Sequence, residues 1–390
     1  MARDKPHVVV VNQHFLPLPG GGSLRVDSIA TGLQTIADNG EALTVSVLTS
    51  SIPNSPSRPY PVSLSLGKAA PSDRPLWRRL IGEVVMGIRA CWQLLWLRPQ
   101  PGLLIISIPS YFMGLMVAAY ARLRRIGYIV DLRDIYPEGY ADAGLLSKTS
   151  LLYRSALRLS ESMYCESRLV ITATNGLKQR VEKLANGQDV AVCYNGYPQF
   201  LSSLHPNKAD RFTVCFHGTL GFFQDIEGLV DVARRLEDSG VEVLVIGYGR
   251  KEHLVRDQAP VNLRFVGRLS LEETLRIVAT AHVGICMRTD DQTSRDAFPI
   301  KIFECLGAGI PVLVSPLCEG GSFVEDKNCG RQFAATDRDG IAKEILRLKN
   351  DPVYYAAQVD GAKRAAGKLS RTSLGEQYAD LVLNVLKSPS

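Results

Sequence analysis

The chain has 390 residues, a hydrophobic content of 46%, a charged content of 22% and a formal net charge of +6 at pH 7. These values are typical of a globular protein, and the length is too great for one ordinary domain, so two are expected. The eight cysteines form no Cys-x-x-Cys pair, which argues against a disulfide framework or a zinc site and indicates buried thiols in a reducing compartment.

The first half of the chain alternates apolar strands with helices. Residues 1–6 lead directly into the first strand, so no signal peptide is expected. Residues 51–73 are rich in Pro and Ser and predict an irregular loop. Strands are expected at residues 7–12, 44–49, 103–107, 128–131, 169–172 and 190–194. The alternation predicts a parallel sheet covered by helices on both faces.

A glycine turn joins the first strand to a helix that ends near residue 38. Gly20, Gly21 and Gly22 lack the G-x-G-x-x-G spacing, and Leu48, at the end of the second strand, is followed by Thr and Ser. A nicotinamide oxidoreductase therefore fits poorly. The turn is either a place where backbone approaches a ligand closely or a simple flexible turn.

The segment from Arg74 to Arg125 is basic and rich in aromatic residues. It contains eight Arg and one Glu, and residues 76–96 predict an amphipathic helix. Its aliphatic and aromatic character favours an anionic bilayer surface over nucleic acid, and a helix that packs on the core remains the alternative. Residues 101–121 carry no charge, but Pro109 divides them into a strand and a helix, so a βα unit is expected rather than a membrane span.

Charged residues gather just past the strand at 128–131. Asp131, Arg133, Asp134 and Glu138 fall within eight residues, at the carboxyl end of a strand, where sites form in such sheets. They are candidate site residues. The alternative is an acidic first turn of a helix in contact with water.

A second set of alternating elements follows a polar stretch at residues 198–210, where the domain junction is expected. His217 and Gly218 follow its first strand, and Arg250 follows its second. Strands are expected at residues 212–216, 241–246, 263–266, 283–286 and 312–314.

The stretch from Asp296 to Pro311 combines features that suit a nucleotide-sugar. Pro299 suits the first turn of a helix, and Lys301 and Glu304 share one face of it. The helix N-terminus suits a phosphate, and a carboxylate can accept hydrogen bonds from the hydroxyls of a ribose or a sugar. The alternative is a capped amphipathic helix with ordinary surface charges.

This stretch resembles the motif of retaining glycosyltransferases of the GT-B fold, in glycosyltransferase family four. That motif is Glu, seven residues, Glu, an Ala/Gly-rich turn and Pro-Val; here Asp296 replaces the first Glu, while Glu304 and Pro311 match. The resemblance covers most of the chain. It implies an α/β protein with two Rossmann-like domains facing each other across a cleft. Residues 1–203 would be the acceptor domain, 204–370 the nucleotide-sugar donor domain, and 371–390 a helix packing back on the first domain.

The resemblance also implies roles for the residues singled out above. The glycine turn and Arg25 would face the donor diphosphate, His217 and Gly218 would contact the donor, and the turn before Arg250 would shape the base pocket. Family members usually carry an Arg and a Lys after the turn at 217–218. Here Phe222 and its neighbours stand instead, so Lys301, Arg25, Arg250 and the helix N-terminus are the expected phosphate partners. A structural His217 is the alternative.

Residues 131–138 resemble the Arg-Asp-Leu-Trp-Pro-Glu segment of bacterial polysaccharide transferases in the same family. Many members have a His immediately before the Asp, where this chain has Arg133, which counts against a histidine-based mechanism. We expect Arg133 to bind the acceptor, Asp134 or Glu138 to orient the acceptor or the transferred sugar, and Asp296 to contact that sugar.

The expected function is retaining transfer of a sugar from a UDP-linked donor to a polyprenyl-diphosphate-linked or saccharide acceptor in surface polysaccharide assembly. No cofactor, metal ion or nucleic acid is expected. The protein would be cytoplasmic and attached peripherally to the inner face of the cytoplasmic membrane. Two alternatives remain open, a nucleotide-sugar 2-epimerase of the same fold and a non-catalytic membrane-associated subunit.

Overall fold

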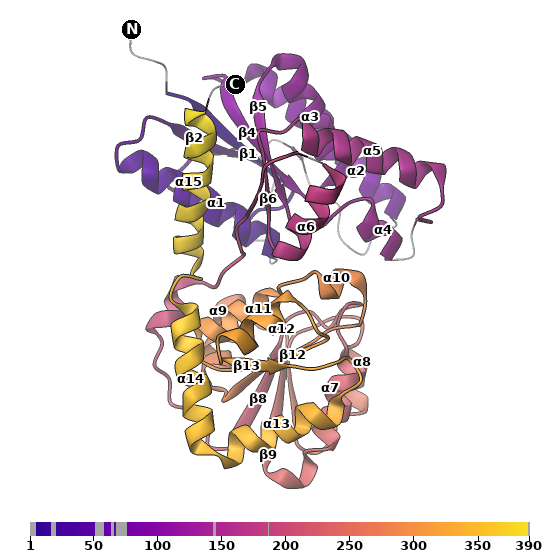
Figure 1. The fold of residues 1–390 in the computed structure, drawn as a ribbon, viewed down its shortest axis with the longest axis vertical. Coiled ribbons are helices and arrows are strands. Elements are labelled where there is room, and N and C mark those ends of the chain that lie inside the picture. Colours follow the sequence, from indigo (N-terminus) through magenta and orange to yellow (C-terminus); the bar gives the residue numbers. More distant parts are fainter. Residues whose placement is uncertain are drawn as a thin grey trace. The chain divides into compact units, whose positions relative to one another are not determined.

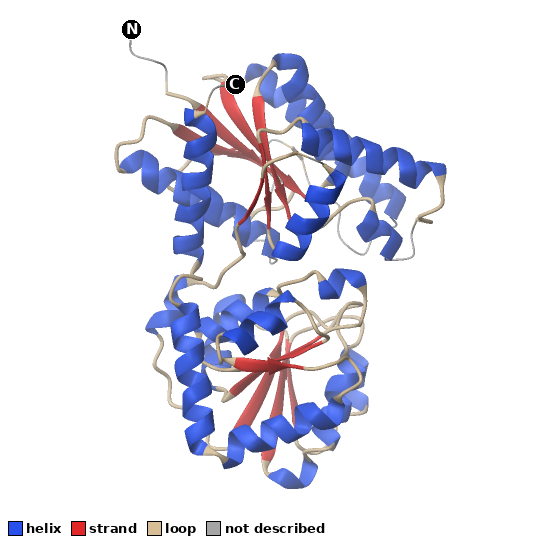
Figure 2. Cartoon of the chain, in the orientation of Figure 1, coloured by secondary structure: helices blue, strands red, loops and turns tan. Residues whose placement is uncertain are grey.

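The computed structural model describes residues 5–16, 21–50, 58–63, 66–67, 76–142, 146–185 and 187–388. The chain divides into two compact units. Unit 1 comprises Met1–Tyr194 and Thr372–Ser390, and unit 2 comprises Asn195–Arg371. Each unit is a sheet flanked by helices, so the expected α/β class is confirmed (Figure 2).

Unit 1 is built on a seven-stranded sheet in the order β3-β2-β1-β4-β5-β6-β7, with parallel pairing throughout. The strand order reverses between β1 and β4, and the carboxyl ends at such a switch point are where ligands bind in open α/β sheets. The strands are β1 (His7–Val11), β2 (Thr44–Leu48), β3 (Val62–Ser63), β4 (Pro101–Ile108), β5 (Gly127–Leu132), β6 (Leu169–Thr172) and β7 (Val190–Val192). The helices are α1 (Gly21–Asp38), α2 (Leu76–Trp96), α3 (Tyr111–Arg124), α4 (Glu138–Asp142), α5 (Leu151–Cys165), α6 (Asn175–Leu184) and α15 (Arg371–Lys387).

Both faces of this sheet are buried, as a parallel sheet requires. Val9 and Val11 of β1 belong to the core layer that includes α2, α3 and α6. Val8 and Val10 belong to the opposite layer, which is covered by α1 and α15 (Figure 1). Tyr378 of α15 is fully buried in that second layer, so the end of the chain completes the core of unit 1.

Unit 2 repeats the plan with six parallel strands in the order β10-β9-β8-β11-β12-β13. Its switch point lies between β8 and β11. The strands are β8 (Phe212–His217), β9 (Val241–Ile246), β10 (Leu263–Gly267), β11 (Val283–Met287), β12 (Val312–Ser315) and β13 (Gly330–Gln332). The helices are η1 (Gln199–Ser203), α7 (Ile226–Arg234), η2 (Glu237–Ser239), α8 (Glu252–Asp257), α9 (Leu271–Thr280), α10 (Gln292–Arg295), α11 (Ile300–Gly307), α12 (Glu319–Asp326), α13 (Arg338–Asn350) and α14 (Pro352–Ala366).

Several local expectations can be compared with these elements. Residues 101–121 form β4 and the start of α3, which confirms the predicted βα unit. Across the described ranges, every helix is too short or too polar to cross a bilayer. Most of the loop expected at 51–73 lies outside the described residues, although it includes the edge strand β3. The units divide at Tyr194 rather than after residue 203, because η1 contacts α9 and α11 of unit 2.

Candidate functional site

The predicted helix after Pro299 is present as α11, at the carboxyl edge of the unit 2 sheet. Pro299 occupies its N-cap position, and Lys301 and Glu304 lie on its first turns. Glu304 and His217, the last residue of β8, are both buried, and their Oε2 and Nε2 atoms are 2.9 Å apart. The helix and the first strand of the domain are thus joined by a polar pair at the switch point.

Glu304 is held inside unit 2 and does not project from it. Its Oε1 lies 3.4 Å from Nη2 of Arg371, so both carboxylate oxygens have protein partners. A carboxylate only accepts, so Nε2 of His217 donates to Glu304. Within the described part of the chain, the buried Nδ1 of His217 has no hydrogen-bond partner. Among the described residues, Nδ1 is therefore the one side-chain polar atom of the pair without a partner.

Lys301 is the cation nearest to this pair along the helix. Its Nζ donates to Oε1 of Gln224 at 2.6 Å and lies 4.1 Å from the centre of the Phe216 ring. Burial lowers the pKa of Lys301 to about 8. A buried ammonium interacts strongly with an anion because little water screens it.

Gly218 makes room for the Lys301 side chain. A Cβ at Gly218 would lie 2.8 Å from Cε of Lys301, and its φ of +108° is one that glycine adopts without strain. The turn after β9 packs directly against the turn after β8, since a Cβ at Gly247 would lie 1.9 Å from the carbonyl oxygen of Gly218. The two glycine turns predicted from the sequence therefore meet at one edge of the sheet.

Asp296 and Arg250 lie at the same edge of unit 2. Asp296 is half-buried at the end of α10, where Oδ1 accepts from Nε2 of Gln292 at 2.9 Å. Arg250 is exposed on the turn that follows β9. Asp296 thus precedes α11 by a short loop, as the sequence motif requires.

In unit 1 the glycine turn and the charged segment come together. Nε of Arg133 donates to the carbonyl oxygen of Ile108 at 3.1 Å. A Cβ at Gly22 would lie 1.9 Å from Nη1 of Arg133, so the guanidinium fits there only because Gly22 has no side chain. Gly21 begins α1, and Gly20 lies outside the described residues.

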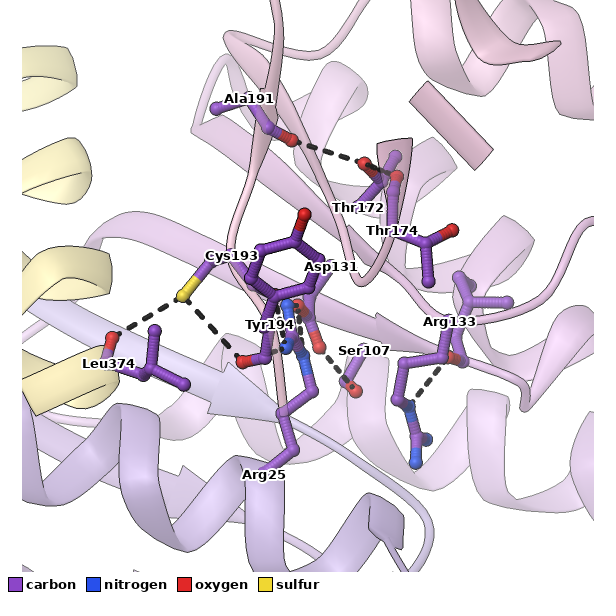
Figure 3. Close-up of polar contacts among 11 residues, drawn as sticks. Arg25, Ser107, Asp131, Arg133, Thr172, Thr174, Ala191, Cys193, Tyr194 and Leu374 are labelled. Carbon is purple, nitrogen blue, oxygen red and sulfur yellow. Dashed lines mark hydrogen bonds and ion pairs between the residues drawn. The ribbon is translucent and has the colours of Figure 1, made fainter. Parts of the chain in front are cut away.

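Arg25, expected to bind the donor phosphate, is instead part of the interior of unit 1. Its Nε and Nη2 lie 2.9 Å and 2.8 Å from Oδ1 of Asp131, and Nη1 donates to the carbonyl oxygen of Cys193 at 2.7 Å (Figure 3). Ser107 donates to the other Asp131 oxygen at 3.1 Å. Burial acts to lower the pKa of Arg25, but Asp131 outweighs it and the pKa is raised. With 3% of its surface exposed, Arg25 is a structural cation rather than a phosphate ligand.

The two remaining carboxylates of the charged segment differ in their surroundings. Asp134 is exposed beyond the end of β5. Glu138 begins α4 and forms an ion pair with Arg180 of α6. Asp134 is therefore the more accessible of the two expected catalytic carboxylates in this unit.

Glu83 is a buried carboxylate of unit 1 that sequence reasoning did not single out. It lies on the buried side of α2, and its Oε2 accepts from the backbone nitrogen of Phe112 at 3.1 Å, at the start of α3. Burial raises the pKa of Glu83 to about 7. Burial, and after it the nearby Glu83 charge, raise the pKa of Tyr140. In the sequence, the one signal that could have pointed to Glu83 is that it is the single glutamate among eight arginines between Arg74 and Arg125.

Residues 211–351, which lie entirely within unit 2, match the family model described as glycosyl transferases group 1. The chain carries a group 1 glycosyltransferase domain. His217, Lys301, Glu304 and Asp296 all belong to this group 1 domain. Among the described residues, no three His, Cys, Asp or Glu side chains are arranged to hold a metal ion.

Similar proteins extend over both units. The probable glycosyltransferase WbjE of Pseudomonas aeruginosa is 23% identical over 307 residues, covering 73% of this chain and 70% of WbjE. The sucrose-phosphate synthase of Thermosynechococcus elongatus has a TM-score of 0.73 at 15% identity, covering 98% of this chain and 99% of the synthase. Anabaena HepE in complex with UDP-glucose has a TM-score of 0.68 at 16% identity, covering 97% and 99% of the two chains. These likenesses confirm the GT-B fold outside as well as inside the group 1 domain.

Proposed function

We propose that the protein transfers a sugar from a UDP-linked donor to a saccharide acceptor with retention at the anomeric carbon. The observation that carries this proposal is the edge of the group 1 domain, which combines a helix N-terminus, the ammonium of Lys301 and the buried, unpaired Nδ1 of His217. The solved complex of HepE with UDP-glucose supports the choice of donor.

The leaving group accounts for the role of Lys301. The bond between the anomeric carbon and the diphosphate oxygen breaks as the acceptor hydroxyl attacks on the same face. Negative charge grows on the diphosphate, whose departing oxygen takes the proton of that hydroxyl. A fixed ammonium and the N-terminus of α11 stabilise that charge. Phosphate neutralisation by these groups requires no divalent metal ion, and we propose a metal-independent reaction.

We assign ribose recognition to the His217–Glu304 pair. Nδ1 of His217 accepts a hydrogen bond from a donor hydroxyl, and Glu304 fixes the tautomer and orientation of the ring through Nε2. Glu304 is therefore a positioning residue in this scheme. Asp296 contacts the hydroxyls of the transferred sugar, whose ring gains positive charge during the reaction. Lys301, Gly218 and Arg250 complete the donor-binding set.

The acceptor binds to unit 1, where Arg133 and Asp134 follow β5 beside the glycine turn. Its chemistry is that of a polyprenyl-diphosphate-linked saccharide, with Arg133 as the diphosphate partner and Asp134 orienting the attacking hydroxyl. Such a substrate belongs to surface polysaccharide assembly and would bring the protein to the inner face of the cytoplasmic membrane.

The proposal is tested by incubating purified protein with a panel of UDP-sugars with and without lipid-linked or saccharide acceptors. We expect UDP release that depends on the acceptor and a product with the anomeric configuration of the donor by NMR. EDTA should leave the rate unchanged. UDP release without an acceptor would indicate epimerase-type chemistry, and an inverted product would contradict the retaining mechanism.

Two variants separate binding from turnover. Glu304→Ala should raise the donor KM and weaken UDP binding in calorimetry, because the His217 ring loses its orientation. Asp296→Ala should lower kcat about tenfold or more while UDP affinity stays near that of the parent, because UDP lacks the transferred sugar. If both variants bind UDP like the parent, the assignment of the His217–Glu304 pair is wrong.

A further inference from the structure

The solvent-facing side of α2 is apolar along most of its length. Six large hydrophobic side chains, each between 37% and 62% exposed, follow one another at helical spacing. Over fifteen residues the rise of a helix gives this stripe a length of about 22 Å. The outer stripe consists of Ile81, Val84, Val85, Ile88, Trp92 and Trp96.

The opposite side of α2 already serves the core of unit 1. Met86, Ala90 and Leu94 are buried in the layer shared with α3, and Glu83 accepts from the start of α3 on that side. The outer stripe is therefore not needed to attach the helix to its own domain. Single exposed hydrophobic residues are ordinary, but a contiguous stripe of this size marks a surface for a partner.

The exposed charged residues of α2 itself are all positive. Arg78, Arg79 and Arg89 are exposed on α2, and Arg98 is exposed just past its end. The one acidic residue of the helix is the buried Glu83. Apolar side chains that reach the acyl boundary, tryptophans at the interface and arginines beside head groups are the composition that anionic bilayers bind.

We propose that α2 lies in the plane of an anionic membrane with the outer stripe inserted below the head groups. A second copy of the chain fits less well, because two identical stripes would oppose arginine to arginine with no exposed carboxylate on either helix to pair them. The proposal deepens the function proposed above by naming the surface that meets the lipid, and it rests on that function for the lipid-linked acceptor.

Helix α2 connects the outer stripe with the part of unit 1 where we place the acceptor. The buried side of the helix reaches the start of α3 through Glu83, directly after the carboxyl end of β4. Arg133 donates to Ile108 at that same strand end. One helix thus presents its outer stripe to the lipid and its inner side to the edge of the sheet where we place the acceptor diphosphate.

The test uses the full chain and vesicles of phosphatidylcholine alone or with 30% phosphatidylglycerol, with binding measured by sedimentation. The variant Ile81→Ser/Ile88→Ser should lower partitioning into the anionic vesicles about tenfold or more. The matched control, Val261→Ser/Val353→Ser, changes exposed aliphatic residues of unit 2 and should bind like the parent. Brominated lipids should quench tryptophan fluorescence in the parent.

Other outcomes separate the alternatives. Arg78→Glu/Arg79→Glu should reduce binding to anionic vesicles selectively; equal binding of the parent to both vesicle types would overturn the anionic preference. Unchanged binding of the serine variant would overturn insertion. A parent dimer in light scattering that the serine variant dissociates would show that a second copy covers the stripe. UDP affinity and transfer to a soluble acceptor are measured separately, so a failure of the membrane proposal is distinguishable from a failure of the proposed function.

Discussion

The titration of Lys301 should appear in the affinity for UDP. Burial lowers the pKa of this lysine to about 8, from an ordinary value of 10.5. A bound diphosphate favours the ammonium and raises its pKa, so binding above pH 8 must be accompanied by proton uptake. Affinity is then constant well below pH 8 and falls at higher pH by up to about tenfold per unit. Between pH 7 and pH 9 the Kd should rise about tenfold, which is about 1.4 kcal/mol.

Calorimetric titration with UDP at pH 7, 8 and 9, in buffers of different ionisation enthalpy, measures both the affinity and the proton uptake. Lys301→Gln should bind UDP more weakly and remove the slope. Lys208→Gln is the matched control, because burial also lowers the pKa of Lys208 to about 8. Its Nζ donates to the carbonyl oxygens of Ala279 and Ala281, before the amino end of β11 and away from the site. A slope that survives in Lys301→Gln, or is absent from the parent, would refute the placement of the diphosphate.

Three further variants test the other assignments. Glu83→Gln should raise the free energy of unfolding of unit 1 at pH 7 by about 3 kcal/mol. Burial raises the pKa of Glu83 from 4.5 to about 7, so between these values the unfolded chain is ionised while the folded one holds the proton, which favours unfolding. In urea unfolding, the gain from the substitution should vanish below pH 4.5. Arg25→Met leaves Asp131 buried without its cation and should cost unit 1 about 3–5 kcal/mol in the same assay, with UDP affinity unchanged; weaker UDP binding would restore Arg25 to the donor site. Gly22→Ala should displace the Arg133 guanidinium and raise the acceptor KM severalfold in steady-state kinetics, and an unchanged KM would count against Arg133 as an acceptor ligand.

The alternation of strands and helices was readable from the sequence because each buried parallel strand is a short apolar run bounded by turn residues. The helix after Pro299 was readable for the same local reasons, since proline favours a helix start and glycine a helix end. These features depend on residues within one turn or one strand of each other.

Long-range polar pairs could not be predicted in this way. Arg25 follows a glycine turn, which suggested a ligand contact. Its ion-pair partner is instead Asp131, which lies 106 residues away in the sequence. His217 and Glu304 were both singled out, yet nothing in their local patterns indicates that they contact each other. Helix α2 was ambiguous for another reason. Both its sides are largely apolar, so periodicity alone left open which side faces the core.

The passage of the chain from unit 1 to unit 2 and back sets the order in which the protein can be completed during synthesis. Unit 2 is one continuous stretch, Asn195–Arg371, and contains all its own strands and helices. Unit 1 is begun first but lacks α15, so one layer of its sheet is covered only by α1 until Leu374 and Tyr378 have been synthesised. Domains usually fold in the order in which they leave the ribosome. Here unit 2 can complete its fold before unit 1, because part of one apolar face of the unit 1 sheet remains exposed until α15 has been synthesised.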